Sequence, residues 1–334
     1  MSTEVLTPAA PASADQPRRV STSVSAGDRV FRGAMRAAGL AVLALTGMIL
    51  AFLLIQGVSA FRQAGISFFS SQSFTPTASK FGIASLLVNG IIVAVIALVI
   101  AIPVAVATAL YISEYAPRRL RRPLITLIDL MAAIPSIVVA LWGLYFLMGR
   151  AVGLQTWLAR HLGFIPFLKV NGDLSVPSTL VGSPFITGVV VAILVIPIVT
   201  SLCREIFSQA PQAEREGAFA LGATRWGMVR SVVLPFGRSG IIGSGMLGMG
   251  RALGDAVVIS FLASPIATIN PHILQSGANG IPFAILLDRN NGPQWLAALM
   301  AAGLVLFALT LPNAPKRPST VPRCKDRNRS ATDI

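Results

Sequence analysis

ASLLVNGIIVAVIALVIAIPVAVATALYI, at residues 84–112, is the stretch that decides the fold, because it contains no charged residue. A transmembrane α-helix needs about 20 predominantly apolar residues, so this stretch predicts a membrane-spanning helix. It exceeds the minimum and contains Pro103, which predicts tilt or a kink. Comparable runs recur elsewhere in the chain, at residues 37–60, 123–148, 185–203, 239–263 and 295–311.

The composition agrees with a membrane protein. Of the 334 residues, 54% are hydrophobic and only 12% are charged, and the mean hydropathy is +0.73. The sequence therefore predicts an all-α membrane protein with six transmembrane helices. We expect a disordered cytoplasmic segment (1–36), a first helix retained as a span with an outer loop (37–83), a main transmembrane domain (84–311) and a basic, Pro-rich cytoplasmic tail (312–334).

The distribution of Lys and Arg predicts the orientation. The net charge is +14, and of 27 basic residues 20 lie in the N-terminal segment, the second-to-third gap, the fourth-to-fifth gap and the tail. Six lie in the opposite gaps, and Arg251 lies inside a span. Basic residues accumulate on the cytoplasmic side, so both termini are predicted to be cytoplasmic. Charge confined to gaps between apolar runs argues against nucleic acid as a partner.

Several kinds of chemistry lack their usual signals. Cys203 and Cys324 have no metal-ligand spacing, and His161 and His272 lie in outer segments without a nearby carboxylate or Cys cluster. No Gly-rich phosphate-binding loop followed by Lys and Ser or Thr occurs. We expect no catalytic residue, no metal, no cofactor and no ATP hydrolysis by this chain itself. Pro135 and Ser136, in the third run, are compatible with either a helix break or a packing kink.

The fourth-to-fifth gap carries a pattern, EGAFALG at 216–222, followed nine residues later by Val232-Val233-Leu234-Pro235. Residues 213–221 predict a helix with acidic residues in its first turn, and Gly222 is placed to cap it. A second helix over 225–233 is expected to be stopped by Pro235. Small residues in this helix pair permit close approach by another protein, although an interfacial helix pair without a partner is the alternative.

This pattern resembles the coupling loop of ABC-importer permeases, Glu-Ala-Ala, three residues, Gly, nine residues, Ile, any residue, Leu-Pro, and departs from it at Gly217 and Val232. The resemblance implies the type I ABC importer permease fold (MetI/ModB-like) and a loop that docks on an ATP-binding subunit. The residues it implies for docking are Glu216, Gly217, Ala218, Leu221, Gly222, Ala223, Leu234 and Pro235.

The fifth run contains two charged residues, Arg251 and Asp255. A charge inside the membrane is costly unless it is paired or functional, and a spacing of four residues puts both on one helix face. One interpretation is a salt bridge that locks the span to a neighbour through a glycine-rich face. The other is a substrate pathway in which Arg251 binds a tetrahedral oxyanion and Asp255 accepts a proton from it, which favours phosphate over sulfate.

Gly250-Arg251-Ala252-Leu253-Gly254-Asp255 resembles the Gly-Arg-Ala-Leu-Gly-Glu signature of the PstC family of phosphate-importer permeases, with Asp for Glu at the last position. The resemblance extends from about residue 84 to at least residue 260. It implies a homologous PstA-like permease, a PstB-like ATPase dimer and a PstS-like external phosphate-binding protein as partners. Rival hypotheses are an ABC permease for sulfate, molybdate or tungstate and a secondary anion transporter. The outer segments 150–184, which include an interfacial stretch at 152–168, and 264–294 are candidates for contact with an external partner.

Overall fold

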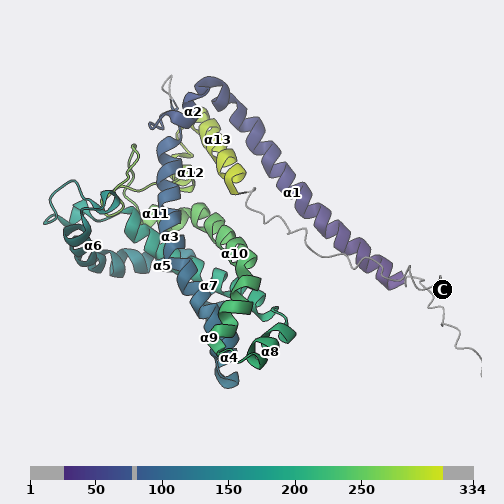
Figure 1. The fold of residues 1–334 in the computed structure, drawn as a ribbon. Coiled ribbons are helices and arrows are strands. Elements are labelled where there is room, and N and C mark those ends of the chain that lie inside the picture. Colours follow the sequence, from purple (N-terminus) through teal and green to yellow (C-terminus); the bar gives the residue numbers. More distant parts are fainter. Residues whose placement is uncertain (1–25, 77–80, 311–334) are drawn as a thin grey trace, which may run out of the picture. The chain divides into compact units, whose positions relative to one another are not determined.

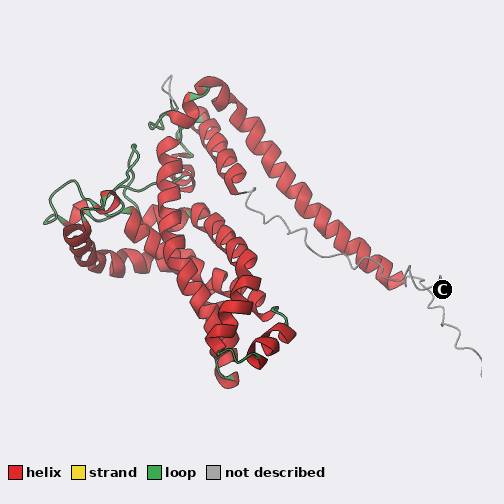
Figure 2. Ribbon diagram, viewed as in Figure 1, coloured by secondary structure: helices red, strands yellow, loops and turns green. Residues whose placement is uncertain are grey.

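A computed structural model describes residues 26–76 and 81–310, and every regular element in these ranges is a helix (Figure 2). Six helical segments are long and apolar enough to cross a membrane, which confirms the predicted all-α, six-span fold. Within these ranges they are Ala26–Ala64, Ala84–Tyr115, Ser136–Leu162, Pro184–Ser208, Arg225–Gly254 and Pro293–Thr310. In the membrane such stretches form helices because only then are all backbone polar groups hydrogen-bonded within the segment.

The chain divides into two units after Ala51, within helix α1 (Ala26–Ala64). Nearly all side chains of α1 before this point are exposed, as expected for a helix whose apolar surface meets lipid or another chain. The end of α1 belongs to the second unit. There Gly57 lies so close to α13 (Pro293–Thr310) that an added Cβ would be 3.0 Å from the Ala301 Cα atom.

The core of the second unit is built on three long helices, α3 (Ala84–Leu110), α7 (Pro184–Ser208) and α10 (Leu234–Gly254), which pack on one another (Figure 1). Alanines at four-residue spacing form a fully buried stripe along α3. Because their side chains are small, the backbones approach closely. The stripe consists of Ala97, Ala101, Ala105 and Ala109.

The third span does not follow the predicted bounds of 123–148. Helix α4 (Arg118–Ala132) ends before Pro135, and α5 (Ser136–Trp142), the π-helical turn η2 (Gly143–Leu147) and α6 (Met148–Leu162) then run on without a gap. Proline lacks an N–H group and disfavours helical geometry in the residue before it, so Pro135 separates α4 from the span. The predicted interfacial stretch 152–168 is largely the continuation of this span.

The fifth span also differs from its predicted bounds of 239–263. Helix α9 (Arg225–Met228) continues through the π-helical turn η5 (Val229–Val233) into α10, so Pro235 does not stop the helix. The wider turn, in which the Leu234 N–H donates to the Val229 carbonyl, accommodates the proline. At the other end, α10 stops at Gly254 and a separate helix, α11 (Ala256–Leu262), follows Asp255.

The remaining elements are short. Helices α2 (Ser67–Ser70) and α12 (Ile281–Asp288) pack with the end of α1 and with α13 around Phe68 and Leu299. A π-helical turn, η1 (Tyr111–Tyr115), ends α3, and α8 (Gln212–Ala220) precedes α9. Two 3₁₀ turns lie between α6 and α7, at Pro166–Leu168 and Pro177–Thr179. Residues 26–36 of the predicted disordered N-terminal segment form the start of α1, so the prediction is wrong there. The rest of that segment, the whole predicted tail and Cys324 fall outside the described residues.

Candidate functional site

The predicted helix-turn-helix begins with α8 and a glycine cap. Gly222 has φ +83°, a conformation that favours glycine, and its N–H donates to the Phe219 carbonyl over 2.9 Å. The Ala223 N–H donates to the Ala218 carbonyl over 3.0 Å. This pair of bonds is the Schellman motif, which ends a helix by satisfying its last carbonyls. The predicted helix over 213–221 and its cap are confirmed to within one residue.

The loop then turns into the fifth span. The Thr224 hydroxyl accepts a hydrogen bond from the Gly227 N–H (3.1 Å) and so caps α9. Apolar side chains at the turn are exposed, and Leu221 retains 91% of its surface. Such exposure of a large apolar side chain beside Phe219 and Trp226, which are also exposed, is typical of a protein-binding surface.

The structure brings six of the predicted docking residues together, at the end of α8 and the turn after it. The Gln212 side-chain amide donates to Glu216 over 2.8 Å, which orients this carboxylate along α8. The remaining two predicted residues, Leu234 and Pro235, lie in the first turn of α10. The six are Glu216, Gly217, Ala218, Leu221, Gly222 and Ala223.

Arg251 and Asp255 do form the predicted ion pair, with 3.7 Å between Arg251 Nη2 and Asp255 Oδ2. Their environments differ, because the Asp255 side chain is 3% exposed whereas that of Arg251 is 45% exposed. Asp255 also accepts a hydrogen bond at Oδ1 from the Val258 N–H (2.9 Å). The carboxylate is thus held at both oxygens, and the guanidinium keeps donors free to face outward from the pair.

The prediction that both residues lie in one helix is wrong. Asp255 has φ −81° and ψ 94°, outside the helical region, and is the N-cap of α11. Aspartate is among the best N-cap residues because its short side chain reaches the N–H groups of the first turn. The helix is therefore interrupted at Asp255, and this interruption places the N-terminus of α11 beside the Arg251–Asp255 ion pair.

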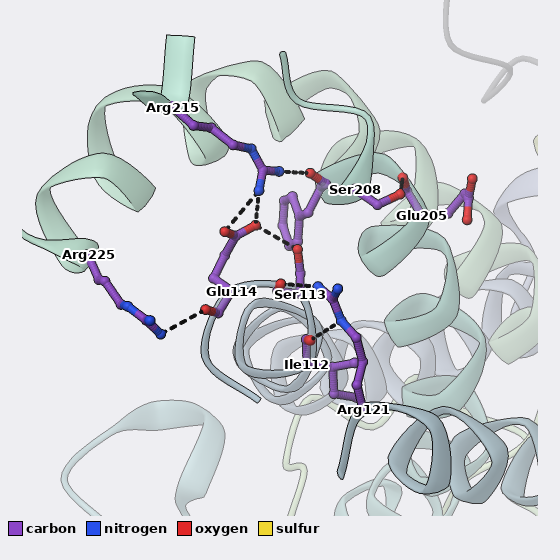
Figure 3. A network of polar contacts seen from close by, with 9 residues as sticks. Ile112, Ser113, Glu114, Arg121, Glu205, Ser208, Arg215 and Arg225 are labelled. Atoms are coloured by element: carbon purple, nitrogen blue, oxygen red, sulfur yellow. Dashed lines mark hydrogen bonds and ion pairs between the residues drawn. The ribbon is translucent and has the colours of Figure 1, made fainter. Parts of the chain in front are cut away.

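A second charged cluster, which the sequence did not reveal, lies at the end of the second span that faces α8 and α9 (Figure 3). Arg215 of α8 contacts both carboxylate oxygens of Glu114 in η1, each at 3.0 Å from Nη1. Arg225 of α9 donates to the Glu114 backbone carbonyl over 3.4 Å. Glu114 lies 101 positions from Arg215 and 111 from Arg225, so no local pattern relates it to either arginine. The one hint was an acidic residue, Glu114, at the end of an apolar run.

The two outer segments are joined to each other. The Ile273 N–H donates to the Phe167 carbonyl over 3.0 Å, and the Phe185 N–H donates to the Ile273 carbonyl over 2.9 Å. Asn89 of α3, fully buried, accepts from the Asn270 N–H over 3.0 Å. Residues from the α6–α7 and α11–α12 connections, which the sequence predicts to lie on the outer side, therefore form one ordered surface. Within the ranges that the structure describes, no three His, Cys, Asp or Glu side chains converge to hold a metal ion.

Six apolar spans, a capped helix pair where the fourth span leads into the fifth and an ion pair at the end of the fifth are the features of a polytopic membrane protein with a docking loop. The chain belongs to the family described as "Binding-protein-dependent transport system inner membrane component", whose model matches residues 101–313. The matched range contains both the α8–α9 loop and the Arg251–Asp255 pair.

Curated relatives are more specific. The chain is 38% identical over 299 residues to phosphate transport system permease protein PstC 2 of Mycobacterium tuberculosis, covering 87% of this chain and 91% of the relative. It is 35% identical to PstC of Haemophilus influenzae, covering 85% and 89%. A crystal structure of a bacterial alginate ABC transporter, bound to a periplasmic protein carrying an alginate pentasaccharide, has the same fold, with a TM-score of 0.54 and 19% identity over 86% of this chain and 94% of that one.

Proposed function

We propose that this chain is the permease subunit of an ATP-driven importer of inorganic phosphate. The assignment of phosphate as the substrate rests mainly on sequence identity. The chain is 32–38% identical to relatives named as phosphate transport permeases, over more than three quarters of its length. The membrane fold and the family fix the class of protein. The substrate rests on these relatives and on the chemistry of one pair of side chains.

Arg251 is the proposed anion contact. Its guanidinium is planar, always charged and suited to two hydrogen bonds with a phosphate. Asp255 holds it from one side over 3.7 Å, and nearly half of the arginine surface remains open. At neutral pH phosphate carries a proton whereas sulfate does not, so a carboxylate beside the bound anion favours phosphate over sulfate. The pair thus supplies both attraction for an oxyanion and a basis for choosing a protonated one.

The α8–α9 loop is the proposed docking site for the ATPase. Its exposed Leu221 and the neighbouring Phe219 offer apolar contacts, and the small residues Gly217 and Ala218 permit close approach. In this proposal ATP is hydrolysed by a PstB-like dimer and not by this chain. The loop side of the protein, and with it both termini, then faces the cytoplasm, as the distribution of basic residues predicts.

Two further partners complete the transporter. A homologous PstA-like permease forms the pathway together with this chain, and a PstS-like binding protein delivers phosphate to the surface formed by the α6–α7 and α11–α12 connections, which lie within the predicted outer segments 150–184 and 264–294. Hydrogen bonds such as that from the Ser276 N–H to the Thr179 carbonyl (2.7 Å) order this surface before any partner arrives. A pre-ordered surface binds with less loss of conformational entropy.

The test is uptake of radiolabelled phosphate by cells that depend on this transporter. Arg251→Gln removes the charge, and we expect uptake to fall by about 10- to 100-fold, since a charged hydrogen bond contributes about 1.5–3 kcal/mol and each 1.4 kcal/mol is tenfold. Arg238→Gln, an exposed arginine nearer the start of the same helix, is the matched control. Normal uptake by Arg251→Gln at normal protein levels contradicts the pathway role. Competition by sulfate or molybdate as strong as that by unlabelled phosphate contradicts the substrate.

A further inference from the structure

The end of the second span is held by arginines from three other helices. The carbonyls in the last turn of a helix have no partner within it and form its negative end. Here the Ile112 carbonyl accepts from Arg121 Nε of α4 over 3.0 Å, the Ser113 carbonyl accepts from Arg121 Nη2, and the Glu114 carbonyl accepts from Arg225. Figure 3 shows these side chains converging on η1 from different sides. Part of the loop therefore acts as a C-cap for α3.

The strongest of these contacts is the ion pair between Arg215 and Glu114. The side chains are 20% and 5% exposed, and Arg215 also donates to the Phe207 carbonyl at the end of α7. The Ser113 hydroxyl donates to Glu114 over 2.7 Å. A charge-assisted contact with both partners largely shielded from water is stronger than one at the surface. A single side chain of α8 thus binds the ends of two core helices.

Besides the half-buried Ala218, which packs against the core, little else attaches α8 to it. None of its residues is fully buried, and it packs mainly against α9 and η5. A hollow of about 430 Å³, bordered by Glu114, Arg215, Glu216 and Phe219, lies between the loop and the helix end. Because this hollow is open, α8 and η1 are not in close packing contact across it, and packing there cannot transmit a displacement of α8 to η1. The Arg215 side chain crosses the hollow and contacts Glu114 directly.

From η1, rigid packing continues to the candidate anion site. A Cβ added at Gly245 of α10 would be 3.1 Å from Ile102 of α3, and one at Gly248 would be 3.4 Å from Leu98. Such close contact means that α3 and α10 move together at this level. Gly248 lies one turn before Arg251. A contiguous series of contacts therefore leads from the loop, through Glu114 and α3, to the Arg251 turn.

We propose that the Glu114–Arg215 ion pair, supported by Arg225, is the joint that transmits movement of the docked α8–α9 loop to α3 and hence to the anion site. Glu114 is on this account a positioning residue that touches neither phosphate nor the ATPase. The inference rests on the proposed function for its direction of transmission, from ATPase to pathway. The contact itself depends on this chain alone.

The test uses the full transporter, purified through this chain and reconstituted in liposomes, with phosphate transported per ATP hydrolysed as the readout. Glu114→Gln keeps the shape and removes the charge, and Arg215→Gln does the same for its partner. We expect each to lower the ratio by about tenfold, the effect of about 1.4 kcal/mol of lost coupling. Because the two act as one unit, the double variant is expected to be no worse than the poorer single variant. Glu205→Gln, an acidic residue on the same side that contacts Gln209, is the matched control.

A merely structural role has a different signature. It lowers the amount of assembled complex and leaves the ratio per complex at the wild-type value, and that outcome overturns the proposal, as do multiplicative effects of the two single variants. A second double-mutant comparison measures the thermal midpoint of the purified full-length chain for the same three variants, which requires no substrate. If the midpoint shift of the double variant equals the sum of the two single shifts, the proposed joint is also overturned. Non-additive shifts, together with a wild-type complex that transports no phosphate, leave the joint in place and contradict the proposed function instead.

Discussion

Two arginine–carboxylate pairs of the second unit, Arg251–Asp255 at the end of the fifth span and Arg215–Glu114 at the loop, share a nearly buried acid but differ in the arginine. At the loop the closest N–O distance is 3.0 Å and Arg215 is 20% exposed. In the span the distance is 3.7 Å and Arg251 is 45% exposed. Arg215 is therefore bound tightly to Glu114, whereas Arg251 is only oriented by Asp255.

The difference indicates how a similar pair serves two purposes. An arginine has five N–H donors. Arg215 directs its terminal nitrogens to Glu114 and to the end of α7, which suits a structural connection. Arg251 makes a longer contact with an acid that is already used as a helix cap, and so presents most of its donors elsewhere. Removing the acid is therefore expected to lower stability much more at the loop than at the end of the fifth span.

The largest expected effect is on stability. Glu114→Ala leaves a largely shielded arginine without its partner, a loss of about 3 kcal/mol. Asp255→Ala removes a helix cap worth about 1 kcal/mol, whereas the half-exposed Arg251 remains solvated. Thermal unfolding of the purified full-length chain is expected to show a clearly lower midpoint for Glu114→Ala. Glu205→Ala, at an exposed position, is the control. A larger decrease for Asp255→Ala contradicts the distinction drawn between the pairs.

A smaller effect separates the two roles of Asp255. Asparagine is as good a cap as aspartate but has no charge, so Asp255→Asn is expected to keep stability and to lower phosphate uptake by about tenfold, as for a charged hydrogen bond of about 1.4 kcal/mol. Asp255→Glu keeps the charge in a side chain less suited to capping. We expect it to lower stability by about 1 kcal/mol and to retain most of the uptake, because the signature that this stretch resembles has Glu here.

Uptake and thermal midpoint, measured on both variants, check this prediction. Uptake that falls equally in Asp255→Asn and Asp255→Glu, at unchanged midpoints, contradicts the assignment of separate roles to the cap and the charge. It means that the site requires both the charge and the length of the aspartate.

Features that depend on local sequence could be predicted. Residues 84–112 form a helix because an apolar stretch in a membrane has no other partner for its backbone. Gly222 caps α8 as expected, since the signal lies within one turn. The i, i+4 spacing of Arg251 and Asp255 correctly predicted their contact. The prediction that both residues lie in one helix was wrong, because the length of an apolar run does not reveal that an aspartate within it is the N-cap of a new helix.

Features that depend on tertiary structure could not be predicted. Pro135 was compatible with a kink or a break, and only the packing of α4 apart from α5 decides for the break. Pro235 was expected to stop a helix, but the helix continues because the wider π-helical turn η5 accommodates a residue that has no N–H donor. Glu114 meets Arg215 across 101 positions of sequence. Periodicity within a helix contains no information about such a pairing.

The smallest expected effect concerns the loop itself and compares two of its glycines. Gly222 has φ +83°, so Gly222→Ala forces a left-handed backbone that costs a non-glycine residue about 1–2 kcal/mol. Gly217 lies within α8 with no atom within 4 Å of an added Cβ. Gly217→Ala therefore stabilises the helix by up to about 1 kcal/mol and restores the alanine of the coupling-loop pattern. Co-purification of the ATPase with this chain is expected to fall several-fold for Gly222→Ala and to be maintained for Gly217→Ala. Equal recovery with both variants contradicts a requirement for this turn in docking, whereas loss with Gly217→Ala places the contact surface on the α8 side chains instead.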